Sequence, residues 1–570
     1  MTSPILNLTS KLMSRAARPD QPKYKTSDVV DFVIVGSGAA GGILAKELST
    51  NGFSVVVLEQ GPYIHESEFS HDEIKILQED FLTNHPKLQP NTFRKTPKDK
   101  AKPQRVLVYG RAVGGTSNHF TANFWRFHEI DFIERSKIGA VPGSTLVDWP
   151  IKYADLEPYY TKVEWEVGVS GLAGASPFDP PRSKPYPMPP LPVKSSGVIF
   201  ERAARKMGWN PFPAPMAILS QPRPGRSACI NCGFCLGFGC EVKAKSSSLA
   251  SMIPLAEKSG KCEIRPNSYV HKIEVDEHGR ATGAVYFDEK KNLYLQKARA
   301  VILSANGAET PRLLLLSASS KFPNGLANSS GLVGKNLMFN TGAISVAVMD
   351  EPLNDYKGFA VSRVLHDFYE LDANKVGFYG GGGLDARYDI TPIGFAFGGL
   401  PPGSPRWGKD YKALLAHNFT RSFEIFGHGT SLPVEDNSFS IDPDVKDDWG
   451  LPALRLTYRD HPDDVKLMHW LADRSSELLD AAGAKQHWTF PIDEQQFGVH
   501  LLGTCRMGND PKTSVVNADH RTHDVKNLFL CDGSSLTTGG RGQPTMTIMA
   551  LAFRAADRIR DLAKRGELNA

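Results

Sequence analysis

Four cysteines lie close together in the segment CINCGFCLGFGCEVKAK, residues 229–245, of a 570-residue chain that holds only seven. They are Cys229, Cys232, Cys235 and Cys240, with the spacing C-x2-C-x2-C-x4-C. Thiols at such spacing can form disulfides, bind a zinc ion or hold an iron–sulfur cluster. The choice between these chemistries depends on the loop itself and on the rest of the chain.

An iron–sulfur cluster suits the segment better than the two alternatives. Disulfides need an oxidising compartment and are crowded at these spacings. A structural zinc site usually draws its four thiolates from two separated pairs. A glycine-rich loop can wrap an inorganic core, and the spacing is similar to the ferredoxin pattern C-x2-C-x2-C-x3-C-P, although here the last gap is four and no proline follows. Three-iron and four-iron cores both remain open.

A second group of residues could hold a diphosphate. Residues 29–35, VVDFVIV, have the composition of a buried parallel strand, and they run into GSGAAGG and then into the helical pattern ILAKELSTNG. A second strand, SVVVLEQG, ends in Glu59, which lies 18 residues after Gly41. The order strand, Gly36-x-Gly38-x-x-Gly41, helix, strand and acid predicts a dinucleotide-binding site.

Each residue of this pattern has a physical task. Gly36 allows the tight turn, and Gly38 lets backbone N–H groups approach a diphosphate. Gly41 lets the helix pack closely on the sheet, while the helix N-terminus stabilises the negative charge. Glu59 would accept hydrogen bonds from a ribose.

The composition limits the classes of protein that remain. Hydrophobic residues make up 41% and charged residues 22% of the chain, and the formal net charge is only +4, which disfavours nucleic acid as the main partner. No stretch approaches the roughly 18 apolar residues of a membrane span. The first 25 residues show no apolar core of a signal peptide, which taken alone predicts a cytoplasmic protein.

Three further segments carry glycines and polar residues next to strand-like runs. They are RVLVYGRAVGGTSNHFTANFWR (105–126), AVILSANGAETPRLLLLS (300–317), and HLLGTCRMG (500–508) followed by VKNLFLCDGSSLTTGGRGQPTMTIMALAFRAADRI (525–559). In the second segment we expect a helix that begins at Thr310 and Pro311. In the last, we expect a helix that begins near Pro544.

Together with GLVGKNLMFN (331–340), these segments resemble the glucose–methanol–choline (GMC) family of FAD-dependent oxidoreductases, from about residue 28 to 560. The resemblance implies a doubly wound, Rossmann-like α/β FAD-binding domain that is discontinuous, with an inserted α+β substrate domain built on an antiparallel sheet. The expected parts are an N-terminal arm (1–27), a first FAD-binding part (28–340) that includes the iron–sulfur loop (225–250), a substrate domain (341–495) and a C-terminal return (496–570).

The resemblance also implies site residues. His500 matches the family's active-site base, and Gln543 stands where the family usually has Asn or His, so it can donate a hydrogen bond but cannot act as a base. A neutral imidazole suits removal of a hydroxyl proton at physiological pH. His119 matches a position that is covalently linked to FAD in some pyranose oxidases, and both a linked and a free histidine remain open. The expected FAD-binding residues are Gly36, Gly38, Gly41, Glu59, Arg111, Gly114, Gly115, Ser117, Asn118, His119, Asn123, Ala305, Asp532, Gly533 and Thr545.

The cysteines narrow the resemblance to bacterial FAD-dependent glucose, fructose, gluconate and glucoside dehydrogenases. In these enzymes a cysteine-bound cluster passes single electrons from the flavin to a cytochrome. The chain has no C-x-x-C-H, so it carries no c-type haem of its own and needs a cytochrome c partner. Such catalytic chains commonly pair with a small subunit that bears a twin-arginine signal, which implies co-export to the periplasm, with the cytoplasm as the alternative.

The sequence therefore predicts a dehydrogenase that oxidises a ring hydroxyl of a sugar or glycoside, with a 3-keto sugar as one product. A gluconate or polyol dehydrogenase is the nearest alternative. A non-redox FAD lyase would have no use for a one-electron relay, and a zinc-stabilised scaffold would leave Glu59, His500 and Asp532 without a task. Cys262, Cys505 and Cys531 are predicted to be buried structural residues. His366, His520 and His523 are predicted to be solvated or core side chains outside the substrate site.

Overall fold

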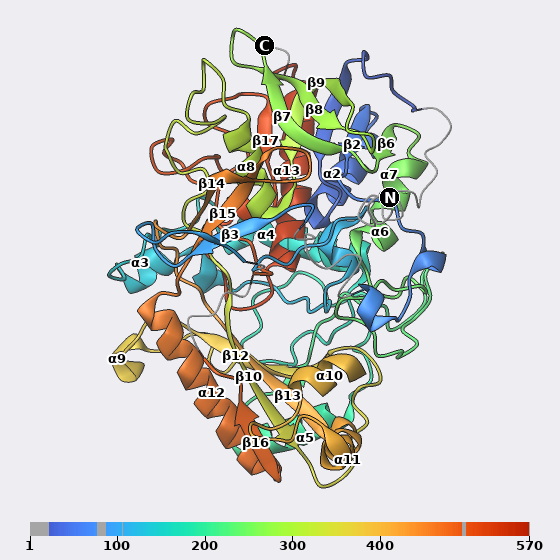
Figure 1. Ribbon diagram of the computed structural model, residues 1–570, viewed down its shortest axis with the longest axis vertical. Coiled ribbons are helices and arrows are strands. Elements are labelled where there is room, and N and C mark those ends of the chain that lie inside the picture. Colours follow the sequence, from blue (N-terminus) through green and yellow to red (C-terminus); the bar gives the residue numbers. More distant parts are fainter. Residues whose placement is uncertain (1–21, 77–86, 105, 493–497, 569–570) are drawn as a thin grey trace.

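The computed structural model describes residues 22–76, 87–104, 106–492 and 498–568. Two bodies lie one above the other in Figure 1, each built on its own large β-sheet. The upper body contains both the first and the last described segments of the chain, as expected for a discontinuous domain. Most of the expected N-terminal arm lies outside the described residues.

The upper body is built on a seven-stranded sheet. Its order is β6-β2-β1-β9-β8-β7, and β17 pairs with β9. Parallel pairing joins β6, β2, β1, β9 and β17, whereas β7 and β8 extend the sheet antiparallel. The strands are β1 (Val30–Val35), β2 (Val55–Leu58), β6 (Cys262–Arg265), β7 (Tyr269–Val275), β8 (Ala281–Phe287), β9 (Leu293–Leu303) and β17 (Leu528–Leu530).

Long helices bury the parallel part of this sheet. Helix α2 (Ala39–Thr50) packs against α13 (Thr545–Lys564), which also packs against α4 (Tyr153–Val163). Strand β1 is almost entirely buried, in keeping with the continuous apolar run that predicted it. Helix α13 begins at Thr545 with Pro544 as its N-cap, so the start predicted near Pro544 is confirmed.

The lower body is built on a six-stranded antiparallel sheet in the order β16-β10-β13-β12-β11-β5. Helix α12 (Pro462–Ala482) and helix α5 (Ser195–Lys206) cover one face of it. The strands are β5 (Phe212–Pro213), β10 (Thr341–Val348), β11 (Val361–Leu365), β12 (Gly382–Arg387), β13 (Ser422–Gly429) and β16 (Gln486–Thr489). The expected boundaries at residues 340 and 495 stay predictions; β5 joins this sheet from an earlier part of the chain.

A four-stranded sheet lies beside the upper body, with β3 (Asn91–Arg94), β4 (Lys102–Pro103), β14 (Ser438–Lys446) and β15 (Pro452–Thr457). The other described helices and helical turns are η1 (Glu66–Glu68), η3 (Gly115–Asn118), η4 (Glu129–Phe132), α3 (Glu134–Ile138), η5 (Glu164–Gly168), α6 (Ser248–Ser251), α7 (Ile253–Lys258), α8 (Asn306–Leu316), α9 (Ala373–Val376), α10 (Pro392–Gly398), α11 (Gly408–Phe419) and η6 (Gly533–Ser535). Within the described ranges, no helix is both long and apolar enough to cross a membrane.

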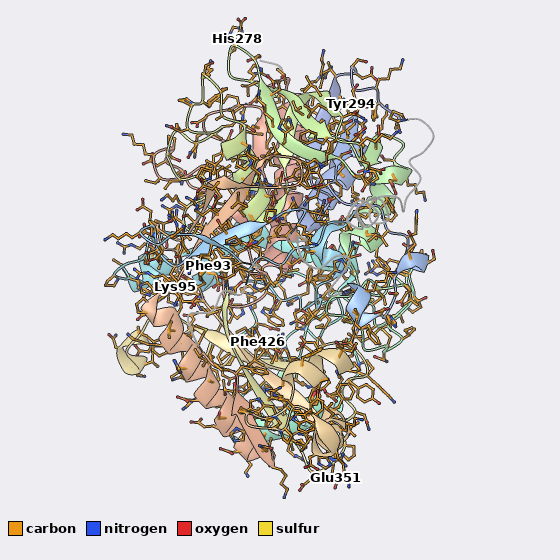
Figure 2. The ribbon with its side chains drawn as sticks, viewed as in Figure 1. Phe93, Lys95, His278, Tyr294, Glu351 and Phe426 are labelled. Atoms are coloured by element: carbon orange, nitrogen blue, oxygen red, sulfur yellow. The ribbon has the colours of Figure 1, made fainter. Side chains whose placement is uncertain are left out.

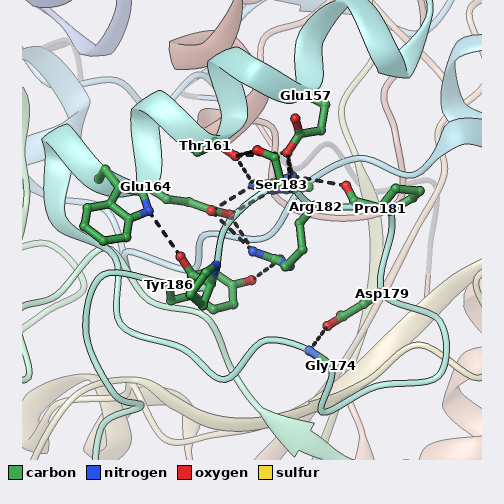
Figure 3. A network of polar contacts seen from close by, with 12 residues as sticks. Glu157, Thr161, Glu164, Gly174, Asp179, Pro181, Arg182, Ser183 and Tyr186 are labelled. Atoms are coloured by element: carbon green, nitrogen blue, oxygen red, sulfur yellow. Dashed lines mark hydrogen bonds and ion pairs between the residues drawn. The ribbon is translucent and has the colours of Figure 1, made fainter.

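A buried ion-pair network fixes the segment that follows His119. The guanidinium of Arg126 donates from Nε and Nη2 to the two carboxylate oxygens of Glu164, both at 2.9 Å, and both side chains are fully buried. Figure 3 shows Arg182 joining the same carboxylate, while Glu157 accepts from the backbone N–H of Ser183. Because a buried charge without its partner is costly, this network holds the segment against α4.

A single methyl group at Gly41 tests how tightly the first helix lies on the sheet. In Gly41→Ala the new Cβ would lie 2.0 Å from the carbonyl oxygen of Gly36, so α2 must move away. We expect a loss of about 1–3 kcal/mol in the free energy of unfolding, measured by urea titration. The matched control is Gly398→Ala in α10, where a Cβ meets nothing within 4 Å. Equal stability of the two variants would contradict the close packing.

Candidate active site

A cavity of about 470 Å³ lies where the two bodies meet. The carboxyl ends of β1, β2 and β9 and the loop after β17 line it from the upper body. Strands β10, β12 and β13 contribute Ile344, Arg387, Glu424 and Phe426 from the lower body. Figure 2 shows Phe426 at the boundary between the two bodies. The crevice at the carboxyl ends of parallel strands is where ligands bind in open α/β sheets.

Most of the residues predicted from the sequence line this one cavity. Segments from opposite ends of the chain therefore face the same space, although the individual roles stay predictions. The predicted residues in the lining are Gly36, Gly38, Glu59, Gly115, Ser117, His119, Asn123, Ala305, His500, Asp532, Gly533, Gln543 and Thr545.

The remaining predicted residues of the upper body lie behind the lining. Gly41 packs against the turn at Gly36, and Gly114 has φ +96° at the start of η3. The amide of Asn118 donates to a backbone carbonyl of its own loop at 2.8 Å. The guanidinium of Arg111 lies over the ring of Trp449, 5.5 Å from its centroid. These four side chains or backbones support the loops that carry the lining.

The glycine turn has the shape that a diphosphate requires. Gly36 has φ +93°, and a Cβ there would lie 2.4 Å from the carbonyl oxygen of Ser304. A Cβ at Gly38 would meet nothing closer than the Cα of Gly115, at 3.9 Å. Since Gly38 is also the N-cap of α2, the first N–H groups of that helix are open to the cavity. The donor set therefore fits the diphosphate of a dinucleotide.

Glu59 is held in place by donors from the glycine turn. Its carboxylate accepts from the N–H and the hydroxyl of Ser37, at 3.0 and 2.8 Å, and from the N–H of Gly61 at 3.0 Å. Burial raises the pKa of Glu59, while these hydrogen bonds favour its charged form. A carboxylate has about four acceptor positions, so one remains for a ribose hydroxyl.

Asp532 follows β17 on the opposite side of the cavity. Thr310 donates its hydroxyl to one carboxylate oxygen at 2.6 Å, and the N–H of Ser534 donates to the other at 2.8 Å. Burial raises the pKa of Asp532. The same Thr310 hydroxyl accepts from the N–H of Ala305 at 3.2 Å, so the ends of β9 and β17 are joined.

The expected start of the helix at Thr310 and Pro311 is wrong, because α8 begins at Asn306. The side chain of Asn306 accepts from the N–H groups of Ala308 and Glu309, at 2.9 and 3.1 Å, and so caps the helix earlier. Pro311 therefore lies inside the helix and cannot donate to the carbonyl of Gly307. The hydroxyl of Thr504, from the segment HLLGT, donates to that carbonyl at 2.6 Å instead.

His500 and Gln543, the expected catalytic pair, both face the cavity. Burial lowers the pKa of His500 to about 4, and the positive charge of Arg387 acts in the same direction. The imidazole is therefore neutral at physiological pH and can accept a proton. Gln543 follows a turn that Arg541 fixes through ion pairs with Asp131 and Glu134, at 2.5 and 2.6 Å.

His119 links the cavity to the cysteine loop. Its Nδ1 donates to the carbonyl of Gly237 at 3.1 Å, and the N–H of Gly237 donates back to its carbonyl at 2.8 Å. Burial and the charge of Lys245 lower the pKa of His119 to about 3. Among the described residues its Nε2 has no hydrogen-bond partner. Leu236, from the cysteine loop, also lines the cavity.

None of the seven cysteines forms a disulfide. Burial raises the pKa of Cys235 to about 12, and it raises the pKa values of Cys229 and Cys232 as well. In the described ranges, no three His, Cys, Asp or Glu side chains form a group that could hold a metal ion. The expected burial of Cys262, Cys505 and Cys531 is confirmed.

Sequence reasoning missed four charged residues. Lys245 is buried beside the cysteines and donates through Nζ to the carbonyls of Cys235 and Phe238, at 2.6 and 2.7 Å. The sequence around Lys245 did not predict this burial, because only the folding of the loop brings the lysine side chain inward. In the same way no motif marks the other three, which lie in or directly after the strands β12 and β13: Arg387, Asp389 and Glu424.

Comparison with known proteins identifies the family. Residues 30–341 match the N-terminal region of the GMC oxidoreductases, and residues 433–552 match their C-terminal region. The chain belongs to the GMC oxidoreductase family and is an FAD-dependent oxidoreductase.

Three curated relatives span almost the whole chain. The chain is 36% identical to 2-methyl-1,2-propanediol dehydrogenase of Mycolicibacterium austroafricanum, over 94% of this chain and 96% of that one. It is 30% identical to the fructose dehydrogenase large subunit of Gluconobacter japonicus, over 94% and 98%. It is 29% identical to the gluconate 2-dehydrogenase flavoprotein of Pantoea cypripedii, over 93% and 94%.

Solved structures share the fold. Formate oxidase from Aspergillus oryzae RIB40 matches with a TM-score of 0.67 and 17% identity, covering 96% of this chain and 100% of that one. Pyridoxine 4-oxidase from Mesorbium loti matches with a TM-score of 0.62 and 17% identity, covering 93% and 99%. The expected α/β fold with a flavin-binding domain and a substrate domain is confirmed.

The exchange of a helix hydrogen bond for one from Thr504 can be tested directly. Thr504→Val keeps the shape but leaves the buried carbonyl of Gly307 without its donor, which costs about 1–3 kcal/mol in unfolding free energy. Pro311→Ala restores an N–H four residues after Gly307. We therefore expect Thr504→Val to cost clearly less in the Pro311→Ala background, measured as a double-mutant cycle by urea titration. Additive effects of the two substitutions would contradict the exchange.

Proposed function

We propose that the protein is an FAD-dependent dehydrogenase that oxidises a hydroxyl of a sugar or glycoside, with a ring hydroxyl converted to a ketone. One observation carries the proposal: neutral His500 and Gln543 line the same cavity as the diphosphate cradle and Asp532. A proton acceptor and a hydrogen-bond donor therefore share one cavity with the expected flavin site.

The chain's own residues supply the proton chemistry. The glycine turn, Glu59 and Asp532 would hold FAD, which would supply the acceptor for the substrate's hydride. His500 accepts the hydroxyl proton, so the alcohol loses one proton and one hydride and becomes a carbonyl compound. Gln543 donates its amide N–H to the substrate oxygen and orients it. Because glutamine does not titrate, His500 is the single base of this scheme.

A small diol or polyol is the second candidate substrate. The relative with 36% identity is named for oxidation of 2-methyl-1,2-propanediol, and two further relatives are named for fructose and gluconate. All three compounds carry adjacent hydroxyl groups. For both candidate substrates, a sugar or a small polyol, one hydroxyl would be oxidised and the neighbouring hydroxyl would help to bind the substrate.

We also propose that the cysteine loop holds an iron–sulfur cluster as an electron exit. Four thiols lie on one glycine-rich loop, and their mutual charge interactions contribute to their pKa values. A cluster holds its thiolates at separate corners of an inorganic core, so they need not converge on one ion. The loop reaches the cavity through Leu236 and bonds to His119 through Gly237. The buried cation of Lys245 would offset part of the thiolate charge.

The electron acceptor and the compartment follow from the same proposal. A cluster that releases one electron at a time suits a cytochrome c partner. The name of one relative, a large subunit, supports a small second subunit for this chain. A small subunit with a twin-arginine signal would carry the folded pair to the periplasm; a cytoplasmic enzyme with another one-electron acceptor is the alternative.

An anaerobic titration tests both parts of the proposal. Glucose, a methyl glucoside and 2-methyl-1,2-propanediol are added while flavin bleaching and the low-temperature EPR signal are recorded together. In Cys235→Ser we expect normal bleaching but at least 10-fold slower reduction of cytochrome c. The matched control is Cys262→Ser, a buried thiol outside the loop, with both rates unchanged.

The outcomes separate the two parts. Normal cytochrome reduction in Cys235→Ser would reject the relay, and zinc in place of iron with labile sulfide would reject the cluster. If dithionite bleaches the flavin but no alcohol does, the dehydrogenase assignment fails.

The protonation state of His500 predicts an unusual pH profile. The base must be neutral, and its pKa is about 4 instead of the usual 6.5. The rate of substrate-driven flavin reduction should therefore stay constant from pH 7 to about 5 and fall only as the pH approaches 4, measured by stopped-flow pH jumps. His500→Asn should slow flavin reduction at least 100-fold, consistent with loss of a general base.

The control for this profile is His520→Asn. His520 is buried with a pKa also lowered to about 4, but it does not line the cavity. Its substitution should leave the rate and the profile unchanged. A decline centred near pH 6.5 in the wild-type enzyme would contradict the environment assigned to His500.

A further inference from the structure

The substrate end of the cavity is one face of the six-stranded sheet. Glu424 pairs with Arg387 across β13 and β12, and Phe426 pairs with Asp385 on the same two strands. Directly opposite residues share a face of a sheet. The other face carries Leu384 and Ile425 into the core under α12. The apolar face of this sheet therefore packs in the core, and the polar face lines the cavity.

The one arginine in this part of the lining is already engaged. Arg387 donates from Nε and Nη2 to the two carboxylate oxygens of Asp385, both at 2.6 Å. Its remaining Nη1 lies 3.5 Å from Asp389, and its guanidinium stacks on Phe426 at 4.3 Å from the ring centroid. Little of the guanidinium is left to bind a substrate carboxylate.

Two carboxyl groups, Asp389 and Glu424, also line the cavity, and they are called here the carboxyl wall. The two side chains are hydrogen-bonded to each other, which requires a proton between them. Burial and the charge of Asp389 raise the pKa of Glu424 to about 8. At neutral pH Glu424 therefore keeps its proton, and Asp389, whose carboxylate lies 3.5 Å from the guanidinium of Arg387, carries the negative charge of the carboxyl wall.

Other charges nearby do not cancel this one. Arg387 is matched by Asp385. Lys194 lies 3.9 Å from Asp355 and donates to the carbonyl of Phe359 at 2.9 Å. The neutral imidazole of His500 adds no charge. One negative charge remains unbalanced at the substrate end.

We propose that the carboxyl wall selects neutral substrates with adjacent hydroxyls and disfavours sugar acids and other carboxylates. The ionised carboxylate accepts hydrogen bonds from two hydroxyls of the substrate. A substrate carboxylate would face a like charge in a site of low dielectric, with no free guanidinium to receive it. This inference rests on the proposed function, since it names the substrate class of the same site.

Ligand pairs that differ only in CH2OH against COO− measure this selection. We would use glucitol with gluconate, and 1,2-propanediol with lactate. Dissociation constants are measured by calorimetry on the dithionite-reduced holoenzyme, which cannot oxidise the ligand. For the wild type at pH 7 we expect the neutral member to bind at least 10-fold more tightly. In Asp389→Asn/Glu424→Gln this preference should fall to within about 2-fold, because the charge is gone.

Glu424→Gln alone is the matched control. It mimics the protonated carboxyl group and leaves the charge of Asp389, so the preference at pH 7 should remain. Above pH 8 the wild type loses the shared proton, and its preference for the neutral ligand should rise at least 3-fold between pH 7 and 9. Glu424→Gln should show no such rise, which tests the inference even if the double variant does not fold. Glu201→Gln, paired with Arg363 outside the lining, controls for general effects of losing a carboxylate.

The results separate this inference from the proposed function. Equal or tighter binding of the carboxylates to the wild type, or no binding of the neutral ligands, would overturn the carboxyl wall. So would a preference unchanged in the double variant, or a pH dependence retained in Glu424→Gln. Neutral ligands that bind with the expected preference but never bleach the oxidised flavin would reject the dehydrogenase and leave the carboxyl wall standing.

Discussion

The close crossing of the HLLGT segment over the start of α8 is the contact on which the site depends. The carbonyl of Leu501 lies so near Gly307 and Gly533 that a Cβ would come within 2.0 Å at the first and 2.5 Å at the second. Thr504 supplies the hydrogen bond that Pro311 cannot make. Only with glycine at both positions can the C-terminal segment pack this closely against the start of α8. This close packing brings His500 and Asp532 to the crevice beside β1 and β9.

The two ends of the cavity treat ionisable groups differently: one stabilises their charged forms, and the other favours neutral forms. At the cofactor end, N–H groups and hydroxyls surround Glu59 and Asp532 and favour their charged forms, while the N-terminus of α2 remains open for an anion. At the substrate end, burial removes charge: His500 stays neutral, and Asp389 and Glu424 share a proton. The cofactor end therefore suits a dianionic diphosphate, and the substrate end suits the neutral alcohol proposed above.

The sequence predicted what depends on short-range pattern. Gly36, Gly38, Gly41 and Glu59 belong to one strand–helix–strand unit, so their spacing is visible along the chain. Arg387 and Glu424 become neighbours only through the pairing of β12 with β13, and nothing in either strand marks the partner. The start of α8 was misjudged for a similar reason: proline is favoured at helix starts, and the donor that lets Pro311 lie inside comes from almost two hundred residues away. The spacing of the four cysteines is visible in the sequence, whereas the buried position of Lys245 depends on how their loop folds.

The position of β17 has a consequence for biosynthesis. A ribosome releases the chain from the N-terminus, yet β9 stays an exposed edge along Val301–Leu303 until Leu528–Leu530 arrive beside it. An unpaired edge strand invites association with other chains. For most of translation the nascent protein therefore has an open sheet and a half-built cavity, and the flavin pocket can close only after nearly the whole polypeptide has emerged.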